Sequence, residues 1–131
     1  MKIAVDTNVL VRAVVSDDPK QAKIAAKLLT DADLVAIAVP CLCEFVWVLR
    51  RVYGFAAADV SSAIRALLDA ANTETNRPAA EAGLALLDAG GDFADGVIAF
   101  EGQWLGGETF VSFDQKAVAL LAAQGHSTRL P

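Results

Sequence analysis

Short runs of β-branched and apolar residues alternate with longer helical segments along the whole chain, and this alternation constrains the fold most strongly. Such an order is typical of βαβ units built on a parallel sheet. The strands are expected at residues 3–5, 34–38, 73–75, 109–112 and 128–130. Because 131 residues without repeats or linker-like stretches correspond to one domain, we expect a single α/β domain over residues 1–131.

Aspartates mark the expected starts of several helices. Asp18 precedes Pro19, which is the order of a helix N-cap followed by proline at the first helical position. Asp59, Asp92 and Asp114 each precede a segment with helical apolar spacing. We therefore expect these three residues to cap helices in the same way as Asp18.

The composition favours a large apolar core, since 55% of the residues are hydrophobic and only 21% are charged. No uncharged stretch approaches the roughly 18 apolar residues of a membrane span. Cys41 and Cys43 have no further cysteines with which to form a disulfide framework or a metal knuckle. These features predict a soluble protein of the reducing cytoplasm that does not bind membranes.

Several acidic side chains lie at the ends of expected strands or near the starts of expected helices. Asp6 directly follows the first expected strand, and Asp114 follows the fourth by two residues. Asp92 and Asp95 share a face at the start of one helix, and Glu44 lies in the first turns of a helix expected over residues 40–53, in a mainly buried segment. The carboxyl ends of parallel strands and the amino ends of crossover helices meet at one edge of a sheet, where open α/β sheets hold ligands. We therefore expect these acids to gather there.

Gathered carboxylates repel one another, by about 1 kcal/mol per pair at 4 Å in water and about 4 kcal/mol at an effective dielectric constant of 20. A divalent cation removes this repulsion. Oxygen ligands without His or Cys favour Mg²⁺ or Mn²⁺ over zinc, and such ions activate water for phosphodiester hydrolysis. The only histidine, His126, lies far along the chain from these acids and is expected on the surface.

Four segments together resemble a known family. These are Val-Asp-Thr-Asn-Val-Leu at 5–10, Glu44, Asp-Phe-Ala-Asp-Gly-Val-Ile-Ala at 92–99 and Val-Ser-Phe-Asp at 111–114, and they resemble the PIN domain of VapC-type ribonuclease toxins. The resemblance covers the whole chain. It implies an α/β/α sandwich around a mostly parallel sheet of about five strands in the order 3-2-1-4-5. It also implies a Mg²⁺-dependent or Mn²⁺-dependent endoribonuclease, a homodimer and a cognate VapB-type antitoxin.

The resemblance also assigns roles to particular positions. Asp6, Glu44 and Asp95 correspond to the acids that hold the catalytic metal, and Asp114 completes the set. Asp92 is explained fully by helix capping, so its direct contact with metal stays open. The residues expected to support the acids through hydrogen bonds are Thr7, Asn8 and Ser112. Gly96 stands where the family more often has alanine, and it is expected to leave slightly more room beside Asp95.

Two other functions fit part of the sequence. A phosphoacceptor receiver domain also has acids at strand ends, but it needs an acid pair after the first strand, where only Asp6 is present. The second alternative is a PIN-like module that binds RNA or a partner without cleaving it, and the presence of all the expected acids argues against it. Lys20, Lys23 and Lys27 form a basic stripe on one helix, which is either a solvated face or a contact for RNA or an acidic antitoxin segment.

The net charge of −5 at first argues against a nucleic acid partner, because phosphate binding normally requires a basic surface. The chain has 11 basic and 16 acidic residues. Without the five acids expected at the metal site, 11 basic residues remain against 11 acidic ones. The negative net charge therefore comes from the expected metal site, whose cation is not included in the count.

Overall fold

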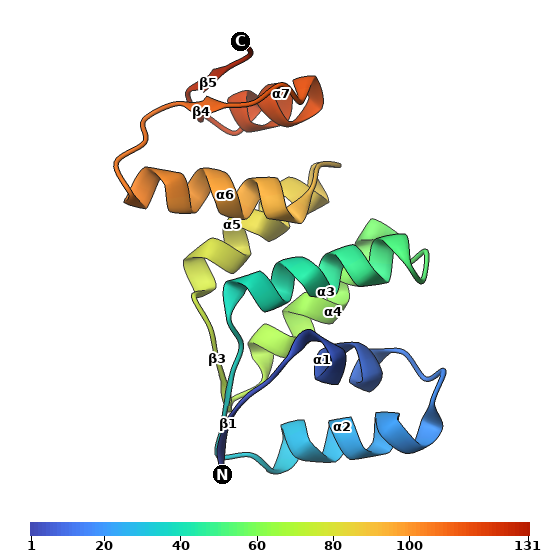
Figure 1. Ribbon diagram of the computed structural model, residues 1–131. Coiled ribbons are helices and arrows are strands. Elements are labelled where there is room, and N and C mark those ends of the chain that lie inside the picture. Colours follow the sequence, from blue (N-terminus) through green and yellow to red (C-terminus); the bar gives the residue numbers. More distant parts are fainter. The chain divides into compact units, whose positions relative to one another are not determined.

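Helices and parallel strands alternate along the chain, which confirms the α/β class that the sequence predicts. The computed structural model describes all 131 residues and contains seven helices and five short strands (Figure 1). Its contacts divide the chain into two compact units, Met1–Asn76 and Arg77–Pro131. No helix combines the length and the apolar character that a membrane span requires.

The first unit is built on a parallel sheet with the strand order β1-β2-β3 (Figure 1). Ile3 pairs with Val35, and Val35 pairs with Thr73 on the other side of the same strand. Parallel neighbours require long crossover connections, and here each crossover contains two helices. The elements in chain order are β1 (Lys2–Ala4), α1 (Thr7–Val14), α2 (Pro19–Asp31), β2 (Leu34–Ala36), α3 (Val39–Arg51), α4 (Ala57–Asp69) and β3 (Thr73–Glu74).

The core of the first unit is formed by helix faces that turn toward the sheet. Leu10 of α1, Phe45 of α3 and Ile64 of α4 are fully buried. Val35, on the central strand β2, is buried as well. The core positions of α3 recur at helical spacing, because only one face of an amphipathic helix is removed from water. This packing holds α1, which Asp6 caps, and α3, which carries Glu44 near its start.

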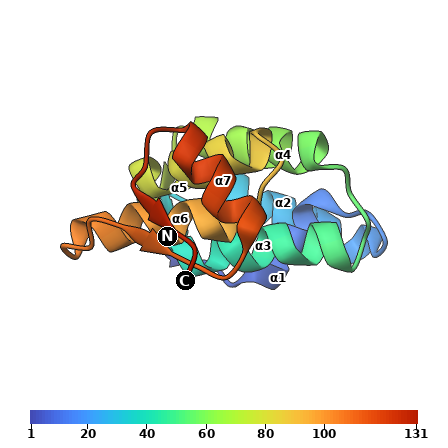
Figure 2. The ribbon, with the colours of Figure 1, turned by 90° about the horizontal axis from the view of Figure 1, so that it is seen from above.

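The second unit contains α5 (Arg77–Asp88), α6 (Phe93–Trp104), β4 (Phe110–Val111), α7 (Gln115–Ala123) and β5 (Thr128–Arg129). β4 and β5 form a parallel pair. Figure 2 shows α7 lying across α5 and α6, and the three helices share a core that contains Leu86, Ala99 and Leu121. This shared core joins α6 and α7, whose amino ends carry three of the predicted site acids.

Two parts of the expected strand order are confirmed. β2 lies between β1 and β3, and β4 is paired with β5. The remaining neighbour relation in the order 3-2-1-4-5, which is that of β1 with β4, stays a prediction.

Most of the expected helix ends are confirmed, and one is wrong. Asp18 caps α2, with its carboxylate accepting a hydrogen bond from the backbone N–H of Gln21 at 3.1 Å. Asp59, however, is not a cap, because α4 begins earlier and has Ala56 at its N-cap position. The alanines before Asp59 favour helix, so the helix extends back through them. Asp59 then lies in the first turn, where the helix dipole favours a negative charge.

The prediction of extra room at Gly96 is also wrong. A Cβ atom built on Gly96 would lie 2.5 Å from the carbonyl oxygen of Ala82 and 3.0 Å from the Cα of Gly83. The space is therefore already filled by the backbone of α5. A glycine is present because the two helices approach each other too closely for any side chain at this point.

Candidate active site

The predicted acids lie at strand ends and helix starts, as the sequence indicates, and each unit carries its own group. Asp6 and Glu44 belong to the first unit, where Asp6 is the N-cap of α1. Asp92, Asp95 and Asp114 belong to the second unit. Asp92 and Asp114 are the N-caps of α6 and α7, and Asp95 lies in the first turn of α6.

Thr7 links the two acids of the first unit. Its backbone N–H donates to the Asp6 carboxylate at 2.7 Å, and its hydroxyl donates to the Glu44 carboxylate at 2.9 Å. The Thr7 residue is buried, whereas Asp6 and Glu44 are exposed. Two carboxylates from segments 38 residues apart are thereby tied to one buried residue between them.

The environment of Glu44 combines the expected buried segment with an exposed carboxylate. The segment around it is mainly buried, but the Glu44 side chain itself is exposed, because the buried face of α3 is made by its neighbours. The Thr7 hydroxyl donates a hydrogen bond to its carboxylate. An exposed carboxylate held from one side keeps oxygen lone pairs available to a ligand.

Cys41 is a neighbour of this group that the sequence analysis did not include. Its thiol is buried and lies 3.6 Å from the Thr7 hydroxyl and 3.7 Å from the carbonyl oxygen of Val5. Burial raises the pKa of the thiol; the hydrogen bond from Thr7 opposes this, and the charges of Asp6 and Glu44 add to the rise. Cys41 therefore stays neutral beneath the two acids. Its position three residues before Glu44, on the same side of a helix, is the signal that could have identified it.

The acids of the second unit interact electrostatically. Burial raises the pKa of the Asp95 carboxyl, and the charges of Asp92 and Asp114 raise it further. Asp92 and Asp114 are each held by a backbone N–H, at 3.2 Å from Ala94 and 3.0 Å from Ala117. The charges of Asp92 and Asp114 are thus close enough to disfavour ionisation of Asp95.

The other predicted residues take different positions. The Ser112 hydroxyl accepts the backbone N–H of Asp114 at 3.0 Å, so it shapes the turn that leads to this acid. Asn8 is exposed on α1. His126 lies next to Gln103, with a side-chain nitrogen separation of 3.2 Å, and both belong to the part of the second unit around β5 and the end of α6. His126, the only histidine of the chain, is therefore part of neither acid group.

The donor chemistry of both groups fits Mg²⁺ or Mn²⁺ better than zinc, because the available ligands are carboxylate oxygens. No three His, Cys, Asp or Glu side chains of the structure are arranged to hold a metal ion by themselves. The first group has two acids joined by Thr7, and in the second group burial and the charges of Asp92 and Asp114 raise the pKa of Asp95. Each group is therefore suited to contribute ligands without completing a coordination shell.

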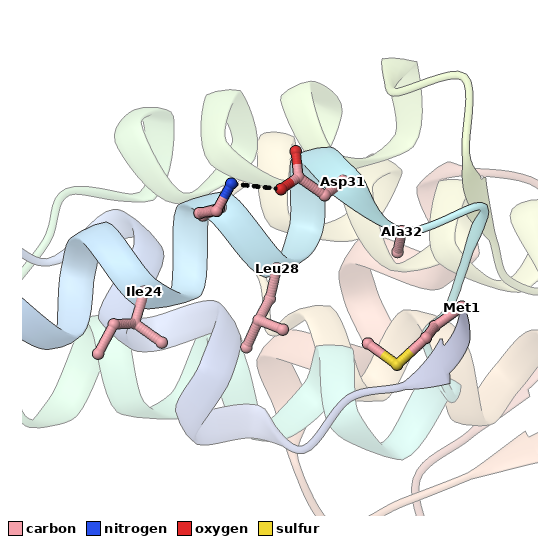
Figure 3. A pocket seen from close by; sticks show the side chains of 6 residues that line it. Met1, Ile24, Leu28, Asp31 and Ala32 are labelled. Atoms are coloured by element: carbon pink, nitrogen blue, oxygen red, sulfur yellow. Dashed lines mark hydrogen bonds and ion pairs between the residues drawn. The ribbon is translucent and has the colours of Figure 1, made fainter.

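A separate pocket in the first unit contains none of the predicted site residues. It has a volume of about 290 Å³ and is lined by Met1, Ile24, Leu28 and Ala32, with the ion pair of Lys27 and Asp31 at its edge (Figure 3). Its lining is mainly apolar, and its two charged side chains neutralise each other. This pocket lacks the convergent polar groups that phosphate chemistry requires.

We compared the sequence of the chain with those of known proteins and families. A family model described as "PIN domain" matches residues 3–120, which include all five acids and parts of both units. No curated protein matches the chain.

Proposed function

The chain belongs to the PIN domain family, and on that basis we propose that it is a Mg²⁺-dependent endoribonuclease that hydrolyses phosphodiester bonds in RNA. The family is associated with metal-dependent ribonucleases and divalent metal binding. The observation that carries the proposal is the group of acids at the starts of α6 and α7, where burial and the charges of Asp92 and Asp114 raise the pKa of Asp95. Such a group is unfavourable until a cation neutralises it.

Four acids are proposed to hold the cation, and these are Asp6, Glu44, Asp95 and Asp114. Mn²⁺ is expected to substitute for Mg²⁺ because both prefer oxygen ligands. When bound, the cation would lower the pKa of a coordinated water and neutralise negative charge at the scissile phosphate. Asp92 caps α6, where its carboxylate accepts the N–H of Ala94, and its direct contact with the cation stays open.

The chain's own residues fix the acids before any substrate arrives. Thr7 holds Asp6 and Glu44, and Ser112 accepts the N–H of Asp114 and shapes its turn. Because no imidazole belongs to either acid group, a carboxylate of the site is the group available to accept a proton from the attacking water. RNA is the proposed substrate, and Asn8 is an exposed polar side chain one residue beyond Thr7 that could contact it or a carboxylate.

The biological role we propose is that of a VapC-type toxin, which a cognate VapB-type antitoxin neutralises and which acts as a homodimer. This role is supported by the sequence resemblance over the four segments that carry the acids. Co-expression with the product of an adjacent small gene should relieve growth inhibition, and light scattering should give twice the monomer mass. Growth inhibition that no neighbouring product relieves would contradict the toxin role.

The nuclease proposal is tested with Asp6→Asn and Asp95→Asn, one variant from each acid group. Each is expected to lower Mg²⁺-dependent cleavage of RNA by about 10²-fold or more, because a charge on which the transition state depends is removed. Asp69→Asn is the matched control, since Asp69 is an exposed acid at the end of α4. Cleavage that persists in EDTA, or full activity in both site variants, would refute the proposal. Folded protein that binds Mn²⁺ but leaves all RNA intact would favour a module that binds without cleaving.

A further inference from the structure

Thr7 forms hydrogen bonds with both acids of the first unit. Its N–H reaches Asp6 at 2.7 Å and its hydroxyl reaches Glu44 at 2.9 Å. Thr7 is only 7% exposed, and it begins α1 directly after the turn from β1. A buried, β-branched residue has a restricted side chain, so its hydroxyl is a fixed donor.

Glu44 depends on such a donor more than Asp6 does. Asp6 is short and is fixed by its own capping geometry at the start of α1. Glu44 is exposed and has three side-chain torsions, which would otherwise let its carboxylate sample many positions in water. The hydrogen bond from Thr7 selects the positions in which the Glu44 carboxylate lies toward the end of β1.

The Thr7 hydroxyl carries a single proton, so it can donate to only one acceptor. Glu44 at 2.9 Å is both nearer and more negative than the Cys41 sulfur at 3.6 Å. Charged acceptors form the stronger hydrogen bonds, which directs the proton to Glu44. Cys41 in turn has the Val5 carbonyl oxygen at 3.7 Å as an acceptor for its own weak donor.

We propose that Thr7 is a positioning residue that holds the Glu44 carboxylate in place relative to Asp6 for a divalent cation. This inference rests on the proposed function, because it assumes that Glu44 is a metal ligand. The Thr7 hydroxyl contacts the ligand and not the metal. Its effect should therefore appear in cation affinity, before RNA is added.

The test is calorimetric titration of Mn²⁺ into metal-free protein without RNA. Thr7→Val preserves the shape of the side chain but removes the donor, and it is expected to weaken Mn²⁺ binding by about 10-fold or more, as is usual for groups that orient a metal ligand. Thr7→Ser retains the hydroxyl and should keep most of the wild-type affinity. Thr30→Val removes a hydroxyl that bonds only the Ala26 carbonyl oxygen within α2, and it should bind Mn²⁺ as the wild type does.

A double-mutant cycle with Glu44→Ala shows whether Thr7 acts through Glu44. In the Glu44→Ala background, Thr7→Val should cause no further loss of affinity. An equal loss in both backgrounds, or wild-type affinity in Thr7→Val, would overturn the inference while leaving the metal site intact. A wild-type protein that binds no Mn²⁺ would instead overturn the proposed function. Melting curves of each variant set a titration temperature at which all are folded.

Discussion

Replacing Gly96 with alanine tests the contact between α5 and α6. The new Cβ would lie 2.5 Å from the Ala82 carbonyl oxygen and 3.0 Å from both the Gly83 Cα and the Leu86 Cβ. These atoms are backbone or directly attached to it, so no change of side-chain rotamer can make room. The two helices must move apart, and a gap of about 0.5–1 Å forfeits a quarter to a half of the dispersion energy at each affected contact.

The expected loss follows from two opposing effects. Overpacking costs about 1–3 kcal/mol, and the upper end applies here because backbone must move. Alanine recovers about 1 kcal/mol through its higher helix propensity. The free energy of unfolding should therefore fall by about 2 kcal/mol, which corresponds to a decrease of roughly 5–10 °C in melting temperature for a domain of this size.

Gly102→Ala is the matched control, because Gly102 lies on the same helix and a Cβ there would meet no atom within 4 Å. It should raise the free energy of unfolding by about 0.5–1 kcal/mol through helix propensity alone. Urea unfolding monitored by circular dichroism measures both changes. If the two substitutions shift stability in the same direction, the close approach of α5 and α6 is not what requires a glycine at position 96.

Three further predictions address a cap, a charge and a thiol. Asp18→Ala removes the acceptor of the Gln21 N–H and should lower the free energy of unfolding by about 1 kcal/mol in urea titrations, whereas Asp18→Asn should not. The pKa of Asp95 is raised above its ordinary value of 3.8, so this group favours folding at pH below 3.8 and the benefit is lost as the pH rises through the folded value. Asp95→Asn should accordingly raise the melting temperature of metal-free protein more at pH 7 than at pH 4, and an equal change at both would contradict the raised pKa. Cys41, buried and with a raised pKa, should react with iodoacetamide more slowly than Cys43 in folded protein, as mass spectrometry of the labelled peptides would show.

The features that could be predicted from the sequence are those that local chemistry determines. Asp18 before Pro19, and Asp92 and Asp114 before apolar helical segments, are caps in the structure because a short carboxylate satisfies free N–H groups within three residues. Asp59 has the same local pattern but lies inside its helix. The preceding alanines can also be helical, so local pattern alone does not select between the two starts.

The features that could not be predicted depend on contacts between distant segments. The hydrogen bond from Thr7 to Glu44 joins residues 37 positions apart, and its formation depends on how α1 packs against α3. The close approach at Gly96 likewise depends on which residues of α5 face α6. Periodicity indicates which face of a helix is buried, but not how near the neighbouring backbone comes.

Net charge is a poor guide to nucleic acid binding when acids are grouped around a cation. The chain carries −5 overall, yet the five acids of the two groups account for all of that excess, leaving 11 basic against 11 acidic residues elsewhere. Three of these acids lie close together, since the charges of Asp92 and Asp114 add to burial in raising the pKa of Asp95. An RNA phosphate would be repelled by these acids without a cation, and it would be attracted only once a divalent ion is bound. Since the remaining surface is neutral, few monovalent counterions would be released on binding. RNA affinity should therefore depend strongly on Mg²⁺ and only weakly on the concentration of monovalent salt.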